Sequence, residues 1–181
     1  MIPQIEGTVA IRASTGPFLQ AFRQRVAGGL LTGRPHPRAN YQVAEAGPDR
    51  LRVRAATFWT AINVGLNDVE VRLPQSGSVQ FHVRYWRWAG YALGLSTVLG
   101  LIGIVLLLTL DVRGYVASHL TAQLPGLTID QNVFLAWAFV IFWGFVWPWL
   151  LIAGHKRPLR RLMERIIREV DAQASGISSA G

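Results

Sequence analysis

Two long stretches without charge dominate the pattern of polar and apolar positions along this chain. Residues 88–110 and 132–154 each contain twenty-three residues and no Asp, Glu, Lys, Arg or His. At about 1.5 Å per residue, a helix of this length covers roughly 34 Å, which is enough for the hydrocarbon core of a bilayer. The pattern therefore predicts two transmembrane helices, joined by the short segment 111–131 into an antiparallel hairpin.

The region before the first apolar stretch, residues 1–87, has two other spacings. Apolar side chains recur on one helical face in the first part and alternate with polar ones between positions 41 and 86. Turn sequences at 47–49 and 74–77 divide the alternating part into two hairpins. We predict an α+β domain in which a helix covers the apolar face of a mostly antiparallel sheet. The expected elements are a short strand within 2–11, a helix over 16–31, the two hairpins, and a further strand over 57–65.

The segment 155–181 has the pattern of an amphipathic helix. Pro158 suits the first turn of this helix. The residues after it place apolar side chains on one face and basic side chains on the other, and a small, polar tail follows. Either the helix lies in the membrane interface with its Arg residues toward anionic lipid, or its stripe is buried against the N-terminal domain or a partner. The stripe consists of Leu159, Leu162, Met163, Ile166, Ile167 and Val170.

The distribution of charge predicts the orientation in the membrane. Residues 1–87 carry eleven Arg and five acidic residues (+6), 111–131 carries one Arg and two Asp (−1), and 155–181 carries six basic and three acidic residues (+3), which together give the net charge of +8. Basic loops stay in the cytoplasm, so both termini are expected inside a bacterial inner membrane and 111–131 outside. The first residues also lack the basic and apolar regions of a secretory signal. The membrane explains the positive charge, and no nucleic acid is expected as a partner.

Residues at the start of the first apolar stretch and just after the second, the two ends expected on the cytoplasmic side, are expected to lie at the level of the lipid headgroups. Amphipathic rings and long cations suit this depth, and the cations can reach anionic lipid phosphates. The expected interfacial anchors are Trp86, Arg87, Trp88, Lys156, Arg157, Arg160 and Arg161.

Small residues in the first apolar stretch indicate a helix–helix contact. Gly90 and Gly94 form a GxxxG pair, and Ser96 and Gly100 form a further small-xxx-small pair. Such spacing lets a neighbouring helix approach closely, either the second span or another protein. The alternative is chance, because glycine is common in membrane helices.

The second apolar stretch is rich in aromatic residues along its whole length. Phe139, Trp143 and Trp147 follow one another at i, i+4 spacing, with the first two near the expected middle of the bilayer. These rings could contact a pigment, a quinone or a lipid held by a partner complex. They could equally face lipid or pack against a helix, which we favour.

The sequence offers little material for chemistry of its own. Cysteine is absent, which excludes disulfides, thiolate catalysis and iron–sulfur clusters. The spans hold no group for a proton relay or haem ligation, and His36, His82 and His119 are isolated in sequence. No catalytic, cofactor or metal site is predicted.

These observations favour a non-catalytic two-pass membrane protein. The leading hypothesis is an accessory or structural subunit of a larger bacterial membrane complex, of the respiratory or photosynthetic kind, with other integral membrane subunits as partners. The alternative is a membrane-tethered regulatory or ligand-binding module in which the cytosolic domain is the sensor.

Overall fold

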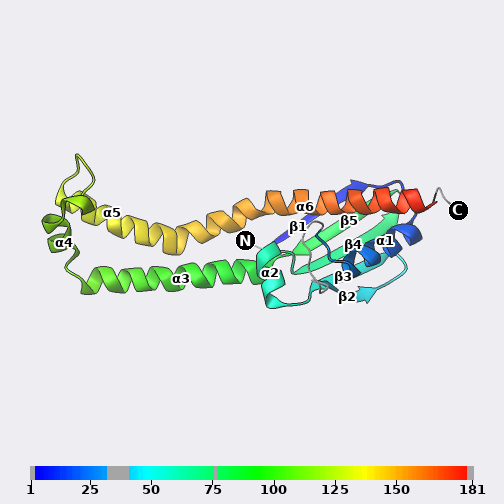
Figure 1. Cartoon of the computed structure of the whole chain (residues 1–181), viewed down its shortest axis with the longest axis horizontal. Coiled ribbons are helices and arrows are strands. Elements are labelled where there is room, and N and C mark those ends of the chain that lie inside the picture. Colours follow the sequence, from blue (N-terminus) through cyan, green and yellow to red (C-terminus); the bar gives the residue numbers. More distant parts are fainter. Residues whose placement is uncertain (1–2, 32–40, 76, 179–181) are drawn as a thin grey trace. The chain divides into compact units, whose positions relative to one another are not determined.

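The computed structural model describes residues 3–31, 41–75 and 77–178, and it has α+β architecture. The chain divides into two compact units. The first combines Met1–Ala89 with Gly154–Gly181, and the second is Gly90–Ala153. The first unit contains a sheet with its covering helices, and the second contains most of the apolar helical sequence (Figure 1).

The sheet of the first unit has five strands in the order β1-β5-β4-β3-β2, and every neighbouring pair is antiparallel. The two hairpins and the early strand predicted from the sequence are confirmed. The alternation of apolar and polar residues along each strand sets the register of strand pairing, because the apolar residues must all lie on one face of the sheet. The strands are β1 (Gln4–Ala10), β2 (Tyr41–Ala46), β3 (Arg50–Ala55), β4 (Asp68–Gln75) and β5 (Ser78–Arg84).

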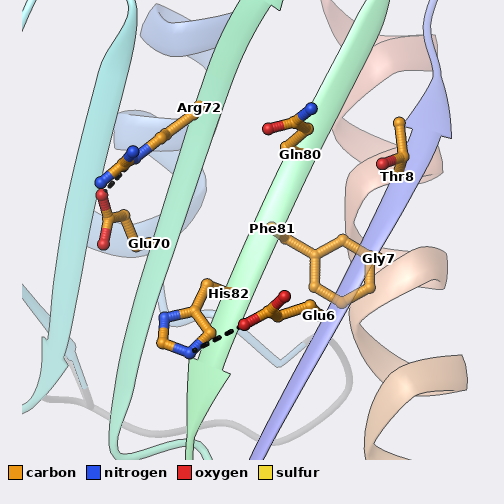
Figure 2. Close-up of a pocket in the computed structure, with 8 residues that line it drawn as sticks. All are labelled: Glu6, Gly7, Thr8, Glu70, Arg72, Gln80, Phe81 and His82. Atoms are coloured by element: carbon orange, nitrogen blue, oxygen red, sulfur yellow. Dashed lines mark hydrogen bonds and ion pairs between the residues drawn. The ribbon is translucent and has the colours of Figure 1, made fainter.

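Two helices, α1 (Thr15–Ala27) and the C-terminal part of α6 (Trp147–Ser178), cover one face of this sheet (Figures 1 and 2). The predicted helix over 16–31 corresponds to α1, which ends a few residues earlier, before Gly28 and Gly29. The inward strand positions and the helix stripes form one apolar core. Its largest fully buried side chains include Tyr41, Tyr85, Phe18, Phe22, Leu30, Leu51, Leu66, Leu159, Met163 and Ile167.

Polar contacts hold α6 against both the residues before α1 and the last turn of α1. The Asp171 carboxylate accepts hydrogen bonds from the backbone N–H groups of Arg12 and Ala13, both at 2.9 Å. The Arg25 guanidinium lies 2.6 Å from the Glu169 carboxylate. The apolar stripe of α6 is buried within the first unit except for the half-buried Leu162, and the basic side chains Arg161, Arg165 and Arg168 are exposed.

The strand predicted over 57–65 is wrong, because this segment forms the short helix α2 (Phe58–Val64). The Thr57 side chain accepts a hydrogen bond from the Thr60 N–H at the helix start. Gly65 ends the helix in the left-handed conformation, with φ of 79°. Phe, Trp, Thr, Ile and Val all favour strands, but caps at both ends supply the hydrogen bonds that a short helix needs.

The second unit is built from helices and the segment that joins them. Among the described residues, two helices are long and apolar enough to cross a membrane, namely Trp86–Thr109 and the continuous run Ile129–Gly176. The segment between them contains a short helix and a 3₁₀ turn, and the Asp111 side chain caps the short helix. The elements are α3 (Trp86–Thr109), α4 (Val112–Ser118), η1 (Leu120–Ala122), α5 (Ile129–Ile141) and the π-helical segment η2 (Phe142–Val146), which leads into α6.

The sequence pattern predicts that a new helix begins at Pro158. In the structure, α6 begins at Trp147 and continues through this residue. A proline within a helix removes the hydrogen bond to the carbonyl four residues earlier, here that of Gly154. The helix nevertheless continues past Pro158 without a break, with this one backbone hydrogen bond absent.

Candidate functional site

A hollow of about 550 Å³ lies on the face of the sheet that the helices leave uncovered (Figure 2). β1, β5 and β4 supply its polar side chains, which alternate with the inward apolar residues of the same strands. On the other face, the buried Phe81 ring lies against Gly7, where a Cβ would collide with it, so glycine is needed at this crossing point. The polar lining consists of Glu6, Thr8, Glu70, Arg72, Gln80 and His82.

Antiparallel register places acidic and basic residues in one row across the sheet. Glu6 lies opposite His82, which lies opposite Glu70 on its other side. His82 Nε2 is 3.7 Å from the Glu6 carboxylate and 3.4 Å from the Gln4 side-chain oxygen. Arg72 Nε donates to Glu70 at 2.5 Å. Hydrogen-bond donors and acceptors, with both positive and negative charge among them, therefore line the hollow.

Further ion pairs extend this polar face toward β2. Arg54 Nε donates to Asp68 at 2.9 Å, and Arg50 pairs with Glu45 across the β2–β3 hairpin. The alternating Arg residues of β3 are thus partly neutralised by acids from neighbouring strands. Such a face can bind a polar partner through hydrogen bonds and charge. Within the described residues, no group of three or more His, Cys, Asp or Glu side chains could hold a metal ion.

A second cluster of side chains lies where α3 begins. Asn67 is buried in the connection between α2 and β4. Its side-chain N–H donates to the Ala61 carbonyl at 3.1 Å, and its side-chain oxygen accepts from the Arg87 backbone N–H at 2.8 Å. The first N–H groups of a helix have no partner within the helix. Asn67 therefore caps the first turn of α3 from a distant part of the sequence.

His155 completes this cluster. Its ring stacks on Trp88 with centroids 4.1 Å apart, and the Tyr85 ring meets its edge at 5.7 Å. The Nε2 atom is buried against Gly65, without a hydrogen-bond partner among the described residues. Burial lowers the pKa of His155 below its ordinary value, because the imidazolium form would lose solvation.

The residues predicted for helix packing fall into two groups. A Cβ built on Gly100 would lie 2.7 Å from the Gly144 Cα, so α3 and η2 approach to backbone contact there. The Ser96 carbonyl lies near the same crossing, 3.6 Å from a Cβ built on Gly144. Cβ atoms built on Gly90 and Gly94 meet nothing within 4 Å. Gly90 and Gly94 are both exposed, and the structure leaves open space where their side chains would lie.

The three aromatic residues predicted for cofactor or lipid contact form a continuous row. The Phe139 and Trp143 centroids are 5.9 Å apart, and those of Trp143 and Trp147 are 4.7 Å apart. Phe139 is 63% exposed and Trp143 43% exposed. These rings contact one another and present an open aromatic surface.

The predicted interfacial anchors differ in their surroundings. Trp86 is half exposed, and the Arg87 guanidinium lies 5.3 Å from its ring centroid. Trp88 instead packs on His155. Lys156 is half-buried, whereas Arg157, Arg160 and Arg161 are exposed, and Arg160 pairs with Glu164 at 2.9 Å. Of the other histidines, His119 bonds to Ser118 and to the Tyr115 carbonyl at the end of α4, and His36 lies outside the described residues.

Sequence reasoning did not identify Asn67, His155, Gly144 or the exposed aromatic pair of α2. Two local signals existed for α2, namely a threonine before the segment and a glycine after it. The contacts of His155 and Gly144 join residues far apart in sequence, and no local pattern shows them. No known family model, curated protein or solved structure matches the chain.

Proposed function

We propose that this protein is a non-catalytic integral membrane protein of the bacterial inner membrane. Its two apolar helices would cross the bilayer as an antiparallel hairpin, with both termini in the cytoplasm. The close approach of Gly100 and Gly144 supports the hairpin, because it lets two apolar helices pack without intervening side chains. The negative charge of 111–131, between two positive regions, supports the orientation.

Within such a membrane, the protein would serve as an accessory subunit of a larger complex of the respiratory or photosynthetic kind. The observation that carries this proposal is the open Gly90–Gly94 pair. The hairpin forms its own glycine contact at Gly100, which leaves the GxxxG face available for a helix of another subunit. The row of Phe139, Trp143 and the half-buried Trp147 offers a second surface, for a partner helix or for a pigment, quinone or lipid that the partner holds.

The basic residues after the second span support a contact with anionic lipid headgroups. Because the apolar stripe of α6 is buried in the first unit, only the basic face would meet the membrane surface. Arg157 and Arg161 are exposed, next to the predicted end of the span. Each such cation contributes about 1 kcal/mol near an anionic surface.

Native purification in mild detergent tests the accessory role. We expect the protein to migrate in stoichiometric amount with a larger complex that carries haem or pigment. A double variant, Gly90→Ile with Gly94→Ile, should still insert but should no longer migrate with that complex, since the added side chains hold a neighbouring helix away. A protein that migrates only as a small oligomer, in both forms, would contradict the proposal.

The hollow in the sheet supports a second candidate, a membrane-tethered regulatory module. Glu6, His82 and Arg72 place charges of both signs around it, which suits a small polar ligand or peptide. The same purification distinguishes the two functions, because a sensor needs no stable partner. A ligand captured by the lone protein, and lost when Arg72 and His82 are both replaced by Ala, would favour this candidate.

A further inference from the structure

The short helix α2 presents two large aromatic side chains on the surface of the first unit. Phe58 is 51% exposed and Trp59 67% exposed, and their rings meet edge to face with centroids 6.0 Å apart. The helix sequence FWTAINV contains no charged residue. A surface helix of a domain surrounded by water usually carries charge opposite its buried side, so an exposed aromatic pair indicates an apolar neighbour.

The position of α2 is fixed relative to the first turn of α3. Asn67 bonds to the Ala61 carbonyl in α2 and to the Arg87 N–H in α3, so one side chain connects the two helices. Gly65, at the end of α2, lies against the His155 ring. Figure 1 shows α2 beside the start of α3, at the end of the domain where that helix begins.

Other features of the same end suit the boundary between water and lipid. Trp86 opens α3 half exposed, with the Arg87 guanidinium over its ring. Trp and Arg together are typical of the headgroup level, where a ring can meet acyl chains while its polar atom meets water. The exposed pair of α2 therefore adjoins the turn at which the chain would enter the membrane.

We propose that α2 is a membrane-contacting foot, with Phe58 and Trp59 inserted at the headgroup–acyl boundary of the bilayer that α3 enters. This inference rests on the proposed membrane crossing of α3 and extends it to a segment outside the apolar stretches. A bilayer is favoured over a protein partner because Asn67 holds α2 at the first turn of α3, which is the level at which the chain would enter the membrane. Interfacial side chains reach about 5–10 Å into this boundary, which is the scale of one short helix.

The absence of cysteine allows a direct test with single fluorescent labels on the full chain. Three variants, Trp59→Cys, Val43→Cys and Leu99→Cys, are each labelled with the environment-sensitive fluorophore NBD. All three positions are exposed in the structure, so labelling need not disturb the core. The proteins are placed in nanodiscs of phosphatidylcholine and phosphatidylglycerol that contain lipids with a nitroxide quencher, either near the headgroup or deep in the acyl chain.

The label at 59 should emit at shorter wavelength than the label at 43, and the shallow nitroxide should quench it more than the deep one does. The label at 43, on β2, should emit as in water and stay unquenched. The label at 99 reports the span itself and should be quenched most by the deep nitroxide. This set of results supports the foot.

Different failures identify which part is wrong. If the label at 59 emits as in water and stays unquenched, like the label at 43, while the label at 99 is quenched, the foot is refuted and the membrane crossing stands. If the label at 59 is shielded from water but insensitive to both nitroxides while the label at 99 is quenched, protein covers the aromatic pair and the foot is again refuted. If the label at 99 is not quenched, the proposed membrane crossing fails and the foot fails with it.

Discussion

The Asn67 side-chain oxygen accepts a hydrogen bond of 2.8 Å from the backbone N–H of Arg87. Twenty positions separate the two residues, and one belongs to the sheet domain while the other lies in the first turn of the first apolar helix. The nitrogen of the same side-chain amide donates a hydrogen bond to the Ala61 carbonyl in α2. One buried side chain therefore satisfies backbone groups of two helices.

Replacing Asn67 by Ala should lower the free energy of unfolding of the first unit by about 1–3 kcal/mol, because two buried backbone groups lose their partner. Asn63→Ala is the matched control, since Asn63 is exposed in the same short helix and should tolerate the change. Denaturation of the purified protein, followed by circular dichroism, measures both. Equal effects of the two substitutions would show that the Asn67 contacts are unimportant for stability.

The sheet could be predicted from sequence because its signals are local. Alternation defines each strand, and turns such as Gly47-Pro48-Asp49 join neighbouring strands, so pairing follows from chain order. The prediction failed at α2, where β-branched and aromatic residues favour a strand and only the caps at Thr57 and Gly65 indicate a helix. Side-chain propensity is a weak signal over seven residues, and hydrogen bonds at the two ends outweigh it.

The candidate sites were less predictable because they depend on contacts between distant segments. The hollow requires the register of β1 against β5, which joins the start of the chain to residues near 80. The GxxxG spacing drew attention to Gly90, whereas the closest helix approach is at Gly100 with Gly144, and the sequence does not state which glycine meets a partner. The apolar stripe of α6 suits a membrane surface and a domain core equally well, and only the fold distinguishes them.

Ile166→Glu tests the buried location of that stripe. Ile166 is 2% exposed, so a carboxylate there would be an unpaired buried charge and should destabilise the first unit by about 3 kcal/mol or more. Hydrogen exchange should accelerate in the sheet as well as in α6. Arg165→Glu, on the neighbouring exposed face, should leave exchange in the sheet unchanged. Faster exchange confined to α6 would instead indicate a helix bound to the membrane surface.

Gly100→Ile tests the close approach of the two apolar helices. The new side chain would collide with the Gly144 backbone, and we expect a loss of about 1–3 kcal/mol in the packing of these helices. Insertion should persist because isoleucine is more apolar than glycine. Crosslinking between cysteines introduced at Gly103 and Val140, whose side chain lies beside Gly103, should become less efficient. Unchanged crosslinking would contradict the contact.

His155 should make the stability of the first unit depend on pH. Burial lowers its folded-state pKa below the unfolded value of 6.5, so between these two values the unfolded chain binds more protons. The stabilisation is complete above pH 6.5 and is lost as the pH falls toward the folded pKa. His155→Gln removes the titrating group. As the pH is lowered, the unfolding free energy of this variant should fall less steeply than that of the unsubstituted protein. The same slope in both proteins would show that His155 titrates without effect on folding.

Membrane crossing by the two apolar helices is tested most directly by labelling single cysteines in intact bacterial cells with a maleimide that cannot cross the inner membrane. We expect Thr121→Cys, exposed in the segment between the helices, to react in intact cells. We expect Gln80→Cys, exposed on the open face of the sheet, to react only after the membrane is permeabilised. Reporters fused at Met1 and Gly181 should both give a cytoplasmic signal. Labelling of Gln80→Cys in intact cells, with Thr121→Cys protected, would contradict this topology, and equal labelling of both positions would contradict membrane crossing.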